Sequence, residues 1–218
     1  MSKNAVIEGS VLPFPAPNLD TDQIMPKQFL RGIDKKGLDR GVFHDMRFDG
    51  QGQPRPDFVM NDPKYAGTSI ILAGANFGCG SSREHAVWGL KQYGIRAVIS
   101  SGFGEIFYSN SMNNGLMLCT VSEESLQRLF AEEAAADAPL PLTIDVDNLR
   151  VISAGGSAPF ALSDRHRRMF MEGLDMLGAS LQHLDAIAQF AEHWHKTHPW
   201  LKNVAATARA RLDLQSPA

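Results

Sequence analysis

One stretch, residues 76–86 (Asn-Phe-Gly-Cys-Gly-Ser-Ser-Arg-Glu-His-Ala), constrains the fold more than any other part of the chain. It follows an apolar run that is typical of a buried strand, and its glycines allow the backbone to approach a ligand closely. Ser81 to Glu84 fits the pattern of a capping box, which predicts a helix from Ser81 to about Tyr93. Backbone N–H groups, hydroxyls and the Arg83 guanidinium then meet at one point, an arrangement that suits a small anion.

Two interpretations of this stretch stay open on spacing alone. Helix initiation would fully explain Ser81 and Glu84 without any ligand. Other glycine-rich motifs do not fit, because a P-loop requires a lysine after its last glycine and the dinucleotide-binding fingerprint requires glycine where Arg83 stands. A nucleophile elbow would require glycine in place of Glu84. The residues therefore predict either an anion site or a capped helix.

Several ordered motifs resemble one protein family. Residues 76–86 resemble the active-site loop of the aconitase superfamily's swivel domain, and more closely that of the small subunit of 3-isopropylmalate dehydratase (isopropylmalate isomerase). Residues 18–30 resemble that family's early loop. Residues 107–111 with 114–116 resemble its third segment, and residues 173–175 with 181–183 resemble a fourth. Long motifs in a fixed order are far more specific than a lone glycine pattern.

Strand and helix patterns alternate in the middle of the chain, which favours a parallel-rich α/β core. Strands are expected at 97–100 and 116–121, and helices at 102–113 and 122–136. Further strand patterns lie towards the two ends of the chain. They cover 6–14, 142–146, 149–152 and 158–162, with a hairpin signal at 147–148.

The resemblance implies an α/β fold of the aconitase swivel type, a β/β/α barrel-like domain with a mixed sheet and a helical C-terminal extension. We expect a single swivel-type domain over residues 1–200 and a C-terminal tail over 201–218. Residues 31–68 are rich in Gly, Asp, Lys, Arg and Pro, and a long irregular segment of this kind is usually a functional loop. In the resembled family a mobile loop here closes over the substrate.

Composition excludes several classes of protein. The chain has 218 residues, a net charge of −3 and 44% hydrophobic residues, which indicates a soluble globular protein without the basic surface that nucleic acid favours. No apolar run approaches the roughly 18 residues of a membrane span, and the N-terminus lacks the apolar core of a secretory signal. We therefore expect a cytoplasmic protein that binds neither nucleic acid nor a membrane.

The cysteine count bears on the cofactor. The dehydratases that the chain resembles use a 4Fe–4S cluster as a Lewis acid, and such clusters are held by three or four thiolates. The sequence contains two cysteines, Cys79 and Cys119. We therefore expect no cofactor bound by this chain and a 4Fe–4S cluster in a large-subunit partner.

By resemblance, the chain is the small subunit of a hydro-lyase that interconverts 2-isopropylmalate and 3-isopropylmalate in leucine biosynthesis and is active only with its large subunit. Ser81 is expected to act as the base in its alkoxide form, and Ser82 and Arg83 to hold a substrate carboxylate. Asp22 is expected to orient a catalytic group, although capping of the following helix or turn fits it equally well. Arg31 is expected beside the substituent that distinguishes substrates, or in water with its stem over the loop.

Two alternative functions remain. The first is a paralogous enzyme for another 2-hydroxy di- or tricarboxylate, of the methylmalate, dimethylmalate, citraconate or homoaconitate type. It stays open because Gly102-Phe103-Gly104-Glu105 replaces the family's usual Ser-Phe-Ala-Asp. The second is a non-catalytic module that binds a dicarboxylate.

Near the C-terminus, the helical spacing of apolar residues from Leu184 to Trp194 predicts a docking or core stripe. Three histidines at 193, 195 and 198 suggest a metal site. The following proline and the lack of acidic neighbours weigh against that interpretation.

Overall fold

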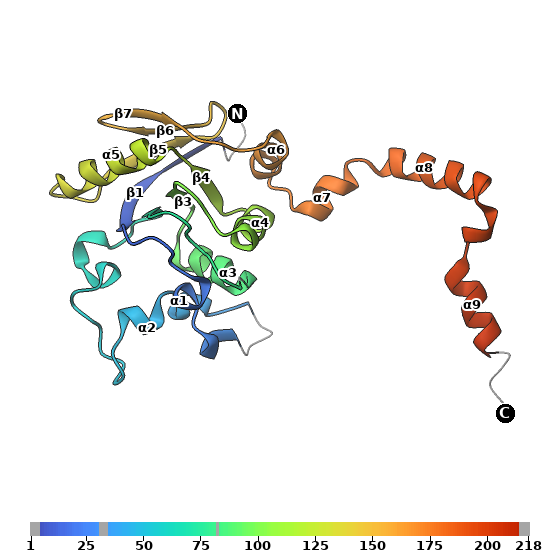
Figure 1. Cartoon of the computed structure of the whole chain (residues 1–218), viewed down its shortest axis with the longest axis horizontal. Helices are drawn as coiled ribbons and strands as arrows, with labels where there is room; N and C mark the ends of the chain where they lie inside the picture. The colour runs from blue at the N-terminus through green and yellow to red at the C-terminus, as the bar shows by residue number, and fades with distance from the viewer. Residues whose placement is uncertain (1–4, 31–34, 82, 214–218) are drawn as a thin grey trace. The chain divides into compact units, whose positions relative to one another are not determined.

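A computed structural model describes residues 5–30, 35–81 and 83–213 (Figure 1). Contacts divide the chain into two compact units between Met176 and Leu177. The first unit contains the sheet with its helices, and the second contains the last helices of the chain. Because a boundary in contacts does not establish independent folding, the single domain over residues 1–200 stays a prediction.

A mixed sheet forms the frame of the first unit, in the order β4-β3-β2-β1-β5-β6-β7. Its strands are β1 (Val6–Phe14), β2 (Ile70–Ala73), β3 (Ala97–Ser100), β4 (Met117–Thr120), β5 (Pro141–Asp145), β6 (Arg150–Ser153) and β7 (Gly156–Pro159). The first part of β1 pairs antiparallel with β5, and its last four residues pair parallel with β2. The sheet is therefore parallel from β1 to β4 and antiparallel from β1 to β7. The predicted mixed sheet with a parallel centre is confirmed.

Helices cover both faces of the parallel half, so its strands are buried on both sides. All four residues of β2 are buried, and they alternate between two apolar clusters as a strand requires. On one face the cluster includes residues of α3 (Glu84–Tyr93) and α4 (Glu105–Asn113), and on the other it includes residues of α5 (Glu123–Ala134) (Figure 1). The carboxyl ends of the parallel strands and the starts of these helices thus share one edge of the sheet.

Local capping signals explain two helix starts but not a third. The Ser122 hydroxyl accepts a hydrogen bond from the backbone of Ser125 at the start of α5, and Ser163 does the same at the start of α6 (Asp164–Glu172). Helix α3, in contrast, begins at Glu84 after an extended Arg83 whose side chain makes no capping bond. The predicted capping box at Ser81 is wrong, because the backbone is extended at Arg83 and Ser81 lies outside the helix.

Short helices lie between β1 and β2, within residues 21–65. They are α1 (Thr21–Ile24), η1 (Lys27–Leu30), η2 (Leu38–Gly41), α2 (His44–Arg47), η3 (Val59–Asn61) and η4 (Pro63–Tyr65). Phe43 is fully buried, and its ring stacks on Phe14 of β1 with centroids 4.6 Å apart. Much of the described part of 31–68 therefore packs against the core, while its mobility stays a prediction.

The second unit begins within α7 (Met176–Leu181), at Leu177, and also contains α8 (Leu184–Thr197), η5 (Pro199–Leu201) and α9 (Val204–Asp213). The predicted helical spacing of α8 is confirmed, but its large apolar side chains are exposed, with Phe190 at 65% and Trp194 at 40%. Within the ranges that the structure describes, no group of three or more His, Cys, Asp and Glu side chains could hold a metal ion. No helix in those ranges is long and apolar enough to cross a membrane.

Candidate active site

Backbone hydrogen bonds hold the glycine loop, residues 76–81, against the segment that leads into α1. The Gly78 N–H donates to the Leu19 carbonyl over 2.7 Å, and the Thr21 N–H donates to the Cys79 carbonyl over 3.1 Å. The early loop and the glycine loop, which sequence analysis treated as separate motifs, are therefore one structural unit.

The segment that follows β3 supports the glycine loop on its other side. The Phe77 N–H donates to the Gly102 carbonyl over 3.1 Å, and the Gly104 N–H donates to the Phe77 carbonyl over 2.9 Å. A Cβ atom at position 104 would lie 2.3 Å from the carbonyl oxygen of Gly78. The glycine at 104, where the resembled family usually has alanine, is thus explained by the close approach of two backbones.

A small hollow brings together three of the predicted site residues, Ser81, Arg83 and Asp22. It lies where the glycine loop meets α1 and the start of α3. Its volume is about 10 Å³. The hollow is lined by Thr21, Asp22, Met25, Leu30, Ser81, Arg83 and Ala86. The other two predicted site residues, Ser82 and Arg31, lie outside the described residues.

The carboxylate of Asp22 does not cap α1, because its neighbour Asp20 does. Asp20 Oδ1 accepts from the Gln23 N–H over 2.8 Å, and Gln23 Oε1 accepts from the Asp20 N–H over 2.9 Å. This is a capping box that sequence analysis missed, although Asp20 and Gln23 have its spacing. Asp22 instead lies 3.3 Å from Lys27 Nζ, with both side chains exposed. The capping alternative for Asp22 is wrong.

The side chains of Ser81 and Arg83 are exposed and make no hydrogen bond or ion pair with any other described residue. The guanidinium of Arg83 therefore keeps its donors for a ligand, and a guanidinium binds a carboxylate through paired N–H···O bonds. The lining also includes three apolar side chains, of which Met25 and Ala86 are buried and Leu30 is half-buried. These apolar lining residues were not identified from the sequence. The hollow thus combines a free guanidinium with a partly apolar lining.

The cysteines of this chain do not fit an iron–sulfur cluster. Cys79 is half-buried in the glycine loop and lies 3.4 Å from the Asn18 carbonyl oxygen. Cys119 is buried in β4, and burial raises the pKa of its thiol. Two thiols in separate environments, in a sequence that contains no others, cannot supply the three or four thiolates of a cluster.

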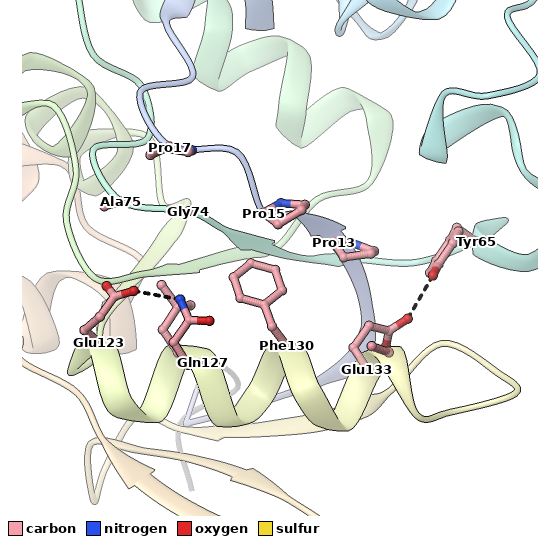
Figure 2. A pocket seen from close by; sticks show the side chains of 12 residues that line it. Pro13, Pro15, Pro17, Tyr65, Gly74, Ala75, Glu123, Gln127, Phe130 and Glu133 are labelled. Atoms are coloured by element: carbon pink, nitrogen blue, oxygen red, sulfur yellow. Dashed lines mark hydrogen bonds between the residues drawn. The ribbon is translucent and has the colours of Figure 1, made fainter.

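A larger cavity of about 540 Å³ lies between α5 and the proline-rich end of β1, and it contains none of the predicted site residues. Figure 2 shows Phe130 pointing from α5 towards Pro13 and Pro15. The polar groups are bonded to one another, as Tyr65 donates to Glu133 over 3.0 Å. Burial, together with this hydrogen bond, raises the pKa of Tyr65 to about 12. The cavity therefore presents an apolar surface without an evident reactive group.

Comparisons with known proteins identify the family that the chain resembles. The model of the family described as Aconitase C-terminal domain matches residues 1–124. The chain is 56% identical to "3-isopropylmalate dehydratase small subunit 1" of Chromobacterium violaceum, over 97% of this chain and 100% of that protein. It is 45% identical to "3-isopropylmalate dehydratase small subunit 2" of Salmonella typhimurium, over 92% and 96%. A crystal structure of 3-isopropylmalate dehydratase from Methanocaldococcus jannaschii matches 84% of this chain and 98% of its own, with a TM-score of 0.60 and 25% identity.

Proposed function

We propose, from the premise that this chain belongs to the family of 3-isopropylmalate dehydratase small subunits, that Ser81, Arg83 and Asp22 form its part of a hydro-lyase active site. The family is shown by two relatives that are 56% and 45% identical over 97% and 92% of this chain. The match of residues 1–124 to the aconitase C-terminal domain supports it. Enzymes of this family isomerise 2-isopropylmalate and 3-isopropylmalate in leucine biosynthesis by removing and re-adding water, and this chain is the small subunit of such an enzyme.

One observation carries the assignment of residues: three side chains from two distant segments line a single hollow. Dehydration needs a Lewis acid on the leaving hydroxyl, a base for the adjacent C–H proton and groups that hold the carboxylates. Arg83 would hold a carboxylate by two parallel N–H···O bonds. Ser82, next to it in the sequence, is proposed to assist.

Ser81 is the proposed base. Its hydroxyl is neither a helix cap nor bonded to another described residue, so it is available to a substrate. An alkoxide at this position would be stabilised by the positive charge of Arg83. It would take the proton from the carbon next to the carboxylate and return it during rehydration. Asp22, which lines the same hollow, would orient the reacting group.

The size of the hollow supports an active site shared with a partner chain. A volume of about 10 Å³ accommodates roughly one water molecule, and isopropylmalate is many times larger. The large subunit would supply the remaining walls and the 4Fe–4S cluster, which polarises the leaving hydroxyl. The partner is proposed to form a stable heteromer with this chain.

The apolar residues in the lining of the hollow favour isopropylmalate as the substrate. The half-buried Leu30, with the buried Met25 and Ala86 in the same lining, offers hydrocarbon to an isopropyl group, which gains from leaving water. Arg31 is the residue that would instead favour a third carboxylate, in an enzyme for another 2-hydroxy acid. We propose a cytoplasmic enzyme that binds neither nucleic acid nor membranes.

Titration separates this enzyme from a non-catalytic dicarboxylate-binding module. Isopropylmalate should bind weakly to the purified chain and turn over only when the large subunit is added. Comparison of isopropyl-, methyl- and dimethylmalate and a citrate-like acid on the same complex identifies the substrate. Tight binding by the chain alone, without turnover in the mixture, would support the binding module.

A further inference from the structure

A buried methionine links the two segments that carry the site residues. Met25 directly follows α1, and its backbone N–H donates to the Thr21 carbonyl over 2.9 Å. Its side chain is 1% exposed and forms part of the hollow. The terminal methyl group reaches helix α3 at Gly89, where an added Cβ atom would lie 2.1 Å from Met25 Cε.

Gly89 occupies the interior of α3, where glycine is among the weakest helix formers. Its position has a packing explanation instead. Besides Met25, an added Cβ would lie 3.1 Å from the Leu38 carbonyl oxygen and 3.1 Å from Val42 Cγ2. Glycine therefore lets the segment between β1 and β2 approach α3 more closely than any side chain would allow.

A second glycine contacts the same side chain from another direction. Gly41 ends η2, and a Cβ atom there would lie 2.6 Å from Met25 Sδ and 2.7 Å from Phe29 Cγ. The thioether of Met25 is thus enclosed between Gly41 and Gly89. We define this enclosure, formed by Gly41 and Gly89, as the methionine slot.

We infer that Met25 is a positioning residue for the reaction: seated in the methionine slot, it fixes the distance between Asp22 on α1 and Arg83 at the start of α3. Asp22 lies three residues before Met25, at α1, and Arg83 directly precedes α3, the helix that contains Gly89. A shift of Met25 out of the slot would therefore change the position of the carboxylate relative to the guanidinium. The inference rests on the proposed function, because it concerns the alignment of that site.

The test is a double-mutant cycle in the reconstituted two-subunit enzyme. Gly89→Ala places a methyl group against Met25 Cε and should lower kcat by about tenfold or more, because small misplacements of reacting groups are costly. The KM should change less, since Arg83 still holds the carboxylate. Met25→Ala empties the slot and should also lower kcat. The double variant should exceed Gly89→Ala in kcat, because the colliding atom is gone.

Gly155→Ala is the control, because an added Cβ there also crowds a side chain, the carboxyl group of Glu132, but one that lies outside the hollow, and it should leave kcat unchanged. A folded Gly89→Ala enzyme with wild-type kcat would overturn the inference. So would a double variant that regains thermal stability but not kcat, since that is the behaviour of ordinary core packing. If Gly89→Ala does not fold, Met25→Ala decides alone, and wild-type kcat in that variant overturns the inference. Full activity of Ser81→Ala, in contrast, would contradict the proposed function whatever the cycle shows.

Discussion

The Thr21 N–H donates to the carbonyl of Cys79 over 3.1 Å, which fixes the first turn of α1 against the glycine loop. An isolated parallel bridge between Asp20 and Cys79 reinforces this contact. Asp22 is thereby placed at the same hollow as Ser81. Because both segments are bonded through their backbones, side chains at this junction can be replaced without removing the contact that holds it together.

Replacement of Ser81 by alanine should lower turnover by about 10²- to 10⁴-fold, the usual contribution of a positioned base. The free energy of unfolding should change by less than about 0.5 kcal/mol, because this hydroxyl caps no helix. Turnover of the reconstituted enzyme and denaturant unfolding of the chain measure the two quantities. Ser122→Ala is the control, since it removes a true cap and should cost about 1 kcal/mol with no loss of turnover. Near-normal turnover of Ser81→Ala would remove the serine from the mechanism.

Asp22→Asn should reduce kcat strongly while leaving the chain as stable as before. Its ion pair with Lys27 is exposed, and exposed pairs contribute at most about 1 kcal/mol. Lys27→Ala breaks the same pair without touching the carboxylate, so it should keep nearly full kcat. Equal losses of kcat in the two variants would show that the ion pair, and not the carboxylate itself, is what the reaction needs.

Elements defined by local patterns could be predicted from the sequence. The bounds of β1 and β3 coincide with the predictions at 6–14 and 97–100, because alternating or continuous apolar residues determine where a strand is buried. The caps at Ser122 and Ser163 were also predictable, since each forms a hydrogen bond within one turn.

Features that depend on distant segments could not be predicted in the same way. Ser81 fits a capping pattern, but backbone bonds hold the glycine loop to residues 18–21 and 102–104, the backbone at Arg83 is extended, and α3 begins only at Glu84. The short helices from Leu38 onwards are not predicted by any periodic spacing of apolar residues. The methionine slot depends on the separation of α1 and α3, which no periodicity encodes. The motifs therefore identified the site residues, while their arrangement required the structure.

Asn114→Ala should lower the free energy of unfolding by about 1–3 kcal/mol, because it leaves two partly buried partners without a bond. Asn114 Nδ2 donates to Glu84 Oε1 over 2.9 Å, and Trp88 Nε1 donates to Asn114 Oδ1 over 2.9 Å. These bonds join α3 to the end of α4. Asn148→Ala, in an exposed hairpin turn, should cost less in the same denaturant titration. Equal costs would mean that the link between the helices adds nothing.

Acidification should destabilise the chain partly through His166. Burial, and secondarily the charge of Arg165, lowers the pKa of His166. The unfolded chain then binds a proton more readily than the folded one, so this contribution is complete above the unfolded pKa of about 6.5 and is lost as the pH falls below it. The thermal midpoint should fall less between about pH 7.5 and 5.5 in His166→Gln than in the wild type. His193→Gln, at an exposed site on α8, should behave like the wild type; identical pH curves for all three would contradict this role.

In the proposed mechanism this chain contributes the base and the carboxylate-binding groups, and its partner contributes the Lewis acid. The most direct test is the initial rate of isopropylmalate dehydration by the chain alone, by the large subunit alone and by their mixture, with iron and sulfide measured in each. We predict turnover in the mixture only, with iron and sulfide in the large subunit and not in this chain. Stoichiometric iron and sulfide in the isolated chain, or full turnover by either subunit alone, would contradict this division of roles between the subunits.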